Sequence, residues 1–218
     1  MRNKLARFAD LKVRQNVLEA GKPLLAEIKG NWNSLFFKND KPITLELACG
    51  RGEYTVGLGR RFPDRNFIGV DIKGARLFFG SREADEEGLQ NVGFLRIKIS
   101  DIDQFFSEDE VDQIWITFPD PRPRDRDEKR RLTHPRFLEM YQRMLKEGGW
   151  LHLKTDDRQF FDFTREMLQQ FPTKDLEWTH DLYSTHLLDD HFGLQTAYEK
   201  RYLEEGRKIN YLRCRLLK

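Results

Sequence analysis

Residues 117–131 read Thr-Phe-Pro-Asp-Pro-Arg-Pro-Arg-Asp-Arg-Asp-Glu-Lys-Arg-Arg. The stretch completes an apolar, β-branched run that begins at Val111 and is typical of a buried strand. Proline fixes its own φ and biases the residue before it toward extended geometry. We therefore expect Asp120, which lies between two prolines, on a stiff arm at the carboxyl end of this strand. Open α/β sheets bind their ligands at such ends.

A cationic strip follows this acid directly. Its cations are Arg122, Arg124, Arg126, Lys129, Arg130 and Arg131, against the three acids Asp125, Asp127 and Glu128. A charged run alone is more often a solvated loop than a binding site. The proline-framed acid beside it favours a site here.

On both sides of this stretch, short apolar runs alternate with amphipathic ones. The expected strands are 43–48, 66–71, 93–98, 111–118 and 150–154, and helical stretches are expected at 53–61, 74–87, 103–106 and 135–146. This alternation predicts βαβ units on a parallel sheet, hence an α/β fold with helices on both faces. After a helix at 159–170, strands at 176–183 and 209–217 enclose a helix at 196–206. The two terminal strands are expected to add an antiparallel edge, which makes seven strands.

The first 40 residues lack strand alternation and are basic, with eight lysines and arginines among residues 1–38. We expect a mobile basic arm with one short helix over residues 1–40, followed by one domain over residues 41–218. The cations of the arm could contact phosphate. The alternative is a disordered tail without a partner, because charged termini are commonly disordered.

Composition limits the class of protein. A net charge of +2 does not by itself indicate a nucleic-acid binder, so any such function depends on where the positive charge lies. Cys49 and Cys214 form no CxxC pair, which favours a reduced, cytoplasmic protein without a zinc site. No apolar run is long enough to span a bilayer, so no membrane partner is expected.

The first expected strand leads into a glycine turn. Gly50 and Gly52 stand where missing side chains allow a ligand to approach backbone N–H groups. Asp71 ends the next strand 21 residues after Gly50, in the place of a carboxylate that accepts hydrogen bonds from ribose hydroxyls. The glycine turn and Asp71 together predict a nucleoside-type cofactor. Thr55 stands where a dinucleotide fingerprint requires a third small residue, so a dinucleotide is disfavoured.

Together with Asp101 after the third strand, this order of acids resembles that of class I S-adenosylmethionine-dependent methyltransferases. The pattern is similar to that of the bacterial tRNA (guanine-N7)-methyltransferase family, which methylates guanine 46 in the variable loop of tRNA. The matching residues are Glu46, Asp71, Asp101, Phe118-Pro119-Asp120-Pro121, Lys129-Arg130-Arg131, Thr155-Asp156 and Thr196-Ala197-Tyr198-Glu199. The resemblance implies a Rossmann-like class I methyltransferase fold, with S-adenosylmethionine as cofactor, S-adenosylhomocysteine as its product and tRNA as partner.

Carried over residue by residue, the resemblance implies roles for several side chains. Glu46, Asp71, Asp101 and Asp120 would contact S-adenosylmethionine beside the turn of Gly50 and Gly52, and Asp120 would also serve catalysis. The implied tRNA contacts are Arg124, Asp156, Thr196, Ala197, Tyr198 and Glu199. For Asp156 a helix N-cap is the alternative, and for Tyr198 and Glu199 a surface helix.

This chain departs from the family pattern at four places. Ala48 replaces the first glycine of the turn, and Asp71 replaces the more common glutamate. Arg122 and Arg124 replace an aromatic residue and a lysine. Positive charge is kept, but the contact with the target base is less well defined.

Methylation at N7 of guanine needs no base, because N7 already offers an in-plane lone pair; positioning therefore dominates. Recognition of a guanine within folded tRNA should depend on shape and phosphate, for which Lys129, Arg130 and Arg131 are candidate contacts. The alternatives are an amino-methyltransferase of another RNA or DNA base and a non-catalytic nucleic-acid-binding protein.

The histidines do not favour a metal. His180, His186 and His191, with Asp189 and Asp190, have spacings that match no compact ligand motif, so no metal is expected. The four tryptophans at 32, 115, 150 and 178 are expected in the core rather than at a base-stacking surface. The sequence is compatible with a monomer or a homodimer.

Overall fold

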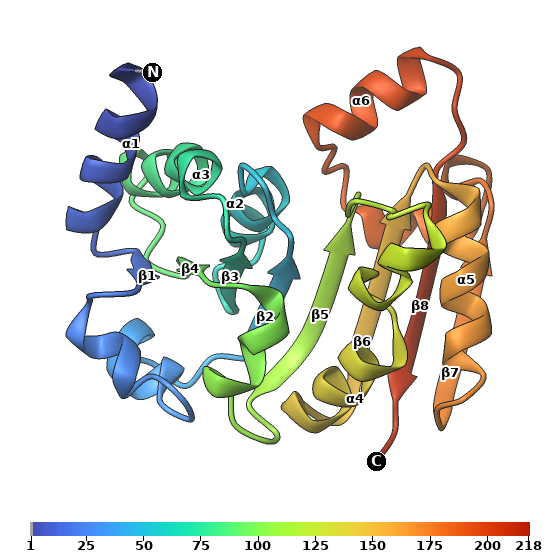
Figure 1. Cartoon of the computed structure of the whole chain (residues 1–218), viewed down its shortest axis with the longest axis horizontal. Coiled ribbons are helices and arrows are strands. Elements are labelled where there is room, and N and C mark those ends of the chain that lie inside the picture. The colour runs from blue at the N-terminus through green and yellow to red at the C-terminus, as the bar shows by residue number, and fades with distance from the viewer. Residues whose placement is uncertain (1) are drawn as a thin grey trace.

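The computed structural model describes residues 2–218, with side chains from Leu5 onward, as one mixed sheet with helices on both faces (Figure 1). The eight strands lie in the order β1-β4-β3-β2-β5-β6-β8-β7. Their bounds are β1 Val17–Glu19, β2 Ile43–Leu47, β3 Asn66–Val70, β4 Val92–Arg96, β5 Val111–Thr117, β6 Leu145–Thr155, β7 Thr173–Thr179 and β8 Asn210–Leu216. Strands β1 to β6 are parallel, and β8 is antiparallel to both β6 and β7. The expected α/β fold with an antiparallel edge is confirmed.

In the described chain α1 precedes the first strand, and five further α-helices and several short helical turns connect the strands. The α-helices are α1 Arg2–Val13, α2 Glu53–Arg61, α3 Gly74–Glu86, α4 Pro135–Met144, α5 Arg158–Leu168 and α6 Ala197–Glu204. The short turns are η1 Pro23–Ala26, η2 Trp32–Phe37, η3 Ile99–Gln104, η4 Asp125–Arg130, η5 Leu182–Ser184 and η6 His186–His191. Among these described residues no helix is both long and apolar enough to cross a membrane.

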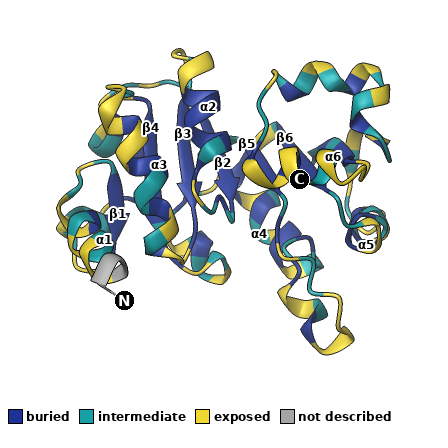
Figure 2. Cartoon of the chain, turned by 90° about the horizontal axis from the view of Figure 1, so that it is seen from above, coloured by how far each residue is buried: buried dark blue, intermediate teal, exposed yellow. Residues whose placement is uncertain are grey.

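Alternation along the central strands divides the core into two layers. On β5, Ile114 and Ile116 point to the layer formed with α4, α5 and η2, whereas Trp115 points to the layer formed with α1, α2 and α3. Since successive side chains of a strand face opposite sides, a strand buried on both faces reads as a continuous apolar run. Figure 2 shows the strands as the buried layer between exposed helical surfaces.

The N-terminal stretch contributes an eighth strand that the sequence does not predict. β1 pairs with β4 from Val17 to Glu19, and both Ile28 and Trp32 are fully buried. The Trp32 ring stacks on Phe106 at 5.2 Å, and its Nε1 donates a hydrogen bond to the Phe105 carbonyl at 2.9 Å. Residues 17–37 therefore pack into the same core as residues 41–218. The expected mobility of residues 1–40 stays a prediction.

Candidate functional site

A cleft of about 480 Å³ opens at the carboxyl ends of β2, β3, β4 and β5. Ala48 follows β2, Asp71 follows β3, and Ile97 to Ser100 follow β4. The arm after β5 supplies Phe118, Pro119, Asp120 and Arg122. The structure thus brings Asp71 and Asp120, 49 positions apart in the numbering, to the same cleft.

The glycine turn between β2 and α2 has a left-handed backbone. Ala48, Gly50 and Gly52 have φ values of 58°, 58° and 75°. A Cβ built at Gly52 would lie 2.5 Å from a ring carbon of Phe94, so only glycine fits there. Ala48 occupies a conformation that favours glycine, which gives a physical reason for the glycine that the resembled family carries at this position.

The Asp71 carboxylate accepts hydrogen bonds from two backbone amides, one in the glycine turn and one just before α3. Its Oδ2 accepts a hydrogen bond from the Gly50 amide at 3.0 Å, and its Oδ1 accepts one from the Lys73 amide at 2.8 Å. The side chain is largely buried yet lines the cleft. Asp101 lies at one side, in η3, where it accepts a hydrogen bond from the Ser100 hydroxyl at 2.9 Å. Ser100 lines the cleft, whereas Asp101 is not among its lining residues.

Glu46 lies beneath the cleft rather than in its wall. Its carboxylate accepts hydrogen bonds from the Thr55 amide at 2.8 Å and the Thr117 hydroxyl at 2.5 Å, and it also contacts the Thr55 hydroxyl. Burial raises the pKa of Glu46 to about 7, although hydrogen bonds from Thr117 and Thr55 oppose the shift. Glu46 therefore joins β2 to the first turn of α2 and to the end of β5.

The arm that carries Asp120 has an unusual backbone. Phe118 and Arg122, on either side of the Pro-Asp-Pro sequence, have φ values of 47° and 50°. The Phe118 amide donates to the Lys154 carbonyl at 2.8 Å, which anchors the arm to β6. The Asp120 side chain is 62% exposed and forms an ion pair with Arg122 Nε at 3.2 Å. Residues in sparsely populated backbone regions concentrate at functional sites.

Cations dominate the wall of the cleft. Against the carboxylates of Asp71 and Asp120 stand six cationic side chains, namely Lys73, Arg76, Lys98, Arg122, Arg130 and Arg136. Such a surface attracts phosphate groups.

Some cations of the cationic strip form ion pairs within the protein. The buried Asp127 pairs with Arg124 at 2.8 Å and with Arg130 at 3.0 Å, while both guanidinium groups stay more than 60% exposed. Lys129 is exposed. Arg131, in contrast, is buried, and its guanidinium lies over the Phe163 ring at 4.4 Å.

The expected tRNA contacts in the C-terminal part of the chain also include both exposed side chains and side chains that are buried or paired within the protein. Thr196 caps α6 by accepting a hydrogen bond from the Glu199 amide at 3.1 Å, and the Ala197 amide donates to Glu53 at 2.7 Å. Tyr198 is exposed, whereas Glu199 is fully buried, so the surface-helix alternative does not hold for Glu199. Asp156 forms an ion pair with Arg207 at 2.8 Å, and the N-cap of α5 is Asp157 rather than Asp156.

A buried ion pair between Lys154 and Glu199 is a feature that the sequence does not reveal. Lys154 Nζ lies 2.8 Å from the Glu199 carboxylate, and neither side chain is exposed. His191 and the Tyr183 hydroxyl also contact this carboxylate, at 3.1 Å and 3.0 Å. Burial opposes ionisation of Glu199, but the contacts with His191 and Lys154 outweigh it and lower the pKa of Glu199. Burial lowers the pKa of Lys154.

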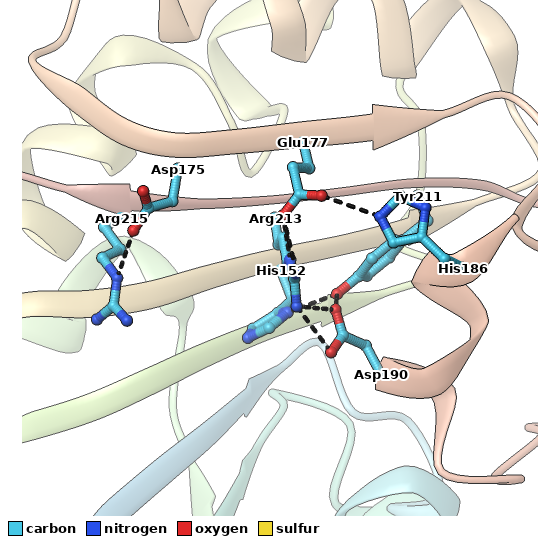
Figure 3. A network of polar contacts seen from close by, with 8 residues as sticks. All are labelled: His152, Asp175, Glu177, His186, Asp190, Tyr211, Arg213 and Arg215. Carbon is cyan, nitrogen blue, oxygen red and sulfur yellow. Dashed lines mark hydrogen bonds and ion pairs between the residues drawn. The ribbon is translucent and has the colours of Figure 1, made fainter.

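A second polar network links β6, β7 and β8 (Figure 3). Arg213 forms ion pairs with Glu177 at 2.7 Å and with Asp190 at 2.8 Å, and the Tyr211 hydroxyl donates to Asp190 at 2.7 Å. His152 contacts the Tyr211 hydroxyl at 2.8 Å, and burial lowers the pKa of His152 to about 3. In the described chain no three His, Cys, Asp or Glu side chains form a group that could hold a metal ion.

Comparisons with known proteins place the chain in a family. A family model described as a putative methyltransferase matches residues 40–212. The chain is 48% identical over 218 residues to a tRNA (guanine-N(7)-)-methyltransferase of Cytophaga hutchinsonii, and the match covers 99% of this chain and 98% of that protein. It is 46% identical to a protein of the same name from Bacteroides fragilis, with 97% and 85% covered.

Solved structures agree on the fold. The structure of the 16S rRNA methyltransferase KamB has a TM-score of 0.61 at 12% identity, over 93% of this chain and 95% of that one. An antibiotic-related methyltransferase has a TM-score of 0.60 at 18% identity, over 92% and 96%. At this identity the likeness shows a shared fold alone.

Proposed function

Since the chain belongs to the tRNA (guanine-N(7)-)-methyltransferase family, we propose that it methylates N7 of guanine 46 in the variable loop of tRNA, with S-adenosylmethionine as donor. The observation that carries the proposal is the cleft in which Ala48, at the start of the glycine turn, meets Asp71 and Asp120; Gly50 and Gly52 lie behind Ala48 and are not among the lining residues. A cytoplasmic location follows from this substrate.

The residues of the cleft fit the donor. The Asp71 carboxylate, held by two backbone amides, suits the ribose hydroxyls. Ile72, Ile97 and Ile99 offer an apolar surface next to it for a purine ring. Gly50 has a φ of 58° and open space where a Cβ would stand, so a ligand could approach the backbone there, whereas the missing side chain of Gly52 makes room for Phe94. In this assignment Asp101 lies beside the cleft, next to the lining residue Ser100, and Glu46 acts through its hydrogen bonds to the first turn of α2 and to the end of β5.

When bound, S-adenosylmethionine supplies an electrophilic methyl group. The residues of this chain need not remove a proton, because guanine N7 carries a free lone pair in the plane of the ring. Asp120 accepts hydrogen bonds from the guanine edge and stabilises the positive charge that develops on the ring. The stiff arm between Phe118 and Arg122 keeps this carboxylate at the cleft.

We assign the candidate tRNA contacts first to cations whose charged groups are exposed. Arg124, Lys129 and Arg130 keep their charges accessible and are our candidates for phosphate contacts, whereas the buried Arg131 supports the strip from below. Thr196, Ala197 and Tyr198 stand at the start of α6 as further candidates, together with Asp156. Glu199 is a positioning residue in this proposal, because its carboxylate is occupied by Lys154 and His191.

One experiment tests the function. The protein is incubated with labelled S-adenosylmethionine and unmodified tRNA, and the tRNA is then digested to nucleosides. We expect 7-methylguanosine, and a tRNA with guanine 46 replaced by adenine should accept no label. Recovery of N6-methyladenosine would identify an amino-methyltransferase instead. Retained tRNA binding without transfer would identify a non-catalytic binding protein.

A further inference from the structure

A second groove, of about 470 Å³, lies between α1 and α3. Its walls include Arg7 and Arg14 of α1 and Phe78, Phe79 and Arg82 of α3; we call it the α1–α3 groove. Figures 1 and 2 both show these two helices side by side, next to the β1 edge of the sheet. No part of the proposed catalytic machinery uses this groove.

Two arginines, Arg7 in the wall of the groove and Arg51 in the glycine turn beside it, lie over the ring of Phe79. The guanidinium carbons of Arg7 and Arg51 lie 4.6 Å and 4.7 Å from the centre of the Phe79 ring. Neither side chain forms an ion pair with any residue of the described chain. Two like charges thus share one ring, and the carboxylate of Asp10, which also lines the groove, is paired with Arg14 instead.

The other cations of the groove differ in this respect. Arg14 forms ion pairs with Asp10 and with Asp85, both at 2.6 Å. Arg82 pairs with Glu86 at 3.4 Å. The positive charge that is not paired with an acid therefore comes from Arg7 in the groove and from Arg51 beside it.

A guanidinium held over an aromatic ring keeps its charge and its in-plane N–H donors. The ring restricts the position of the guanidinium but accepts no hydrogen bond from its in-plane N–H groups and does not neutralise its charge. Phosphate matches such a group, because it carries negative charge and accepts two parallel hydrogen bonds. The α1–α3 groove has the chemistry of a preorganised phosphate site.

Helix α3 connects this groove to the cleft. Its first turn carries Arg76, which lines the cleft, and its next turn carries Phe79, which lines the groove. Lys73, just before α3, also lines the cleft. Neither Lys73 nor Arg76 forms an ion pair in the described part of the chain, so accessible positive charge runs from the cleft along α3 to α1.

We propose that the α1–α3 groove binds the phosphate backbone of a second segment of the tRNA, away from the target guanine, through Arg7 and Arg51. The inference rests on the proposed function in taking tRNA as the partner. An extended polyanion fits an open groove that continues into the cleft better than a single phosphate does, because it can contact both at once.

Replacing Arg7 tests the groove. The affinity of full-length unmodified tRNA transcript is measured without S-adenosylmethionine at about 50 and about 200 mM salt. We expect Arg7→Gln to weaken binding about tenfold at the lower salt and to reduce the slope of log affinity against log salt by about 1. Arg7→Lys should retain the slope. Phe79→Leu keeps the cation but removes the ring, and it should weaken binding roughly threefold.

Arg61→Gln is the matched control. Arg61 is likewise an arginine over a phenylalanine ring, at 5.9 Å from the centre of Phe62, and is exposed whereas Arg7 is half-buried. It lies at the other end of α2 from the glycine turn. Equal effects of Arg7→Gln and Arg61→Gln on tRNA binding would overturn the proposal. So would an equal loss of binding to inorganic phosphate and to tRNA, since the groove would then be a simple anion site.

The binding measurement separates this inference from the proposed function. It needs no methyl transfer, so a wild-type protein that binds tRNA but yields no 7-methylguanosine would contradict the function and leave the groove supported. A protein that yields 7-methylguanosine and binds tRNA equally well with Arg7→Gln would contradict the groove alone. The turnover number of Arg7→Gln at saturating tRNA should equal that of the wild type.

Discussion

At the scale of single residues, Asp120 is exposed and yet restrained. The prolines on either side limit its backbone, and the left-handed residues Phe118 and Arg122 mark the ends of the arm. Its carboxylate is 62% exposed and pairs with Arg122 Nε at 3.2 Å. The carboxylate is therefore available to a substrate rather than used in folding.

We expect Asp120→Asn to lower the turnover number about 100-fold, because an amide cannot stabilise the positive charge on the methylated ring. The affinity for S-adenosylmethionine should change much less. Single-turnover kinetics and equilibrium binding of the donor measure the two quantities. Asp125→Asn, an exposed acid in η4, is the control and should leave both unchanged. Parallel losses of turnover and of donor affinity would reduce Asp120 to a binding residue.

Glu46 predicts a dependence of stability on pH. Its pKa is about 7 in the folded protein against an ordinary value of 4.5, so the folded state binds the proton more tightly than the unfolded state. The stabilisation is fully present below about pH 4.5 and is lost as the pH rises toward 7. The difference corresponds to about 3 kcal/mol.

Glu46→Gln should remove this dependence, because the amide does not titrate. The free energy of unfolding is measured by urea denaturation of both proteins at several pH values. The stability of the wild type relative to Glu46→Gln should fall as the pH rises from about 4.5 to 7. A constant difference over that range would mean that Glu46 titrates in the folded protein as it does in the unfolded chain.

At the scale of elements, the Lys154–Glu199 ion pair joins β6 to α6. Lys154→Met would leave a buried carboxylate without its cation, so we expect a loss of about 3–5 kcal/mol in the free energy of unfolding. Adding Glu199→Gln to Lys154→Met should restore part of it. A double-mutant cycle by urea denaturation measures the coupling. The exposed pair of Arg158 and Asp162 is the control, and Arg158→Met should cost less than about 1 kcal/mol.

The parallel strands could be read from the sequence because each is a short apolar run between turn residues. The structure agrees within two residues for β2 to β5. Strand β6 begins earlier than expected, since it continues through Gly148 and Gly149 with an irregularity opposite β5. Strand β1 is three residues long, and its burial depends on pairing with β4, so no local pattern marks it.

The site was predictable only in part. Motif spacing brings Asp71 and Asp120 together, because parallel strands end at one edge of the sheet. Burial of Arg131 and Glu199 depends on Phe163 and Lys154, which lie far from them in sequence. A charge pattern does not show which arginine is buried, so the sequence alone does not distinguish the buried Arg131 from the exposed Arg130. Packing decides which charges stay available.

At the scale of the whole molecule, residues 17–37 complete the core. We expect Trp32→Ala to lower the free energy of unfolding by about 3–5 kcal/mol, because Trp32 is fully buried and stacked on Phe106. Urea denaturation measures the loss. Trp178 is 41% exposed, and Trp178→Ala is the control with a smaller expected effect. A small effect of Trp32→Ala would mean that this stretch contributes little to folding.

The two outermost strands affect how copies of the chain meet in concentrated solution. A long, straight rim of unpaired peptide groups invites a neighbouring molecule to add a strand and so begin fibrous aggregation. Here β1 spans only Val17–Glu19, and pairing of β7 is interrupted near Asp175, which has a φ of 54°. Lys174, Asp175 and Glu177 also place charges along that rim. Neither rim offers a template for intermolecular strand addition, so the native protein should resist fibril formation during crowded cellular synthesis or storage.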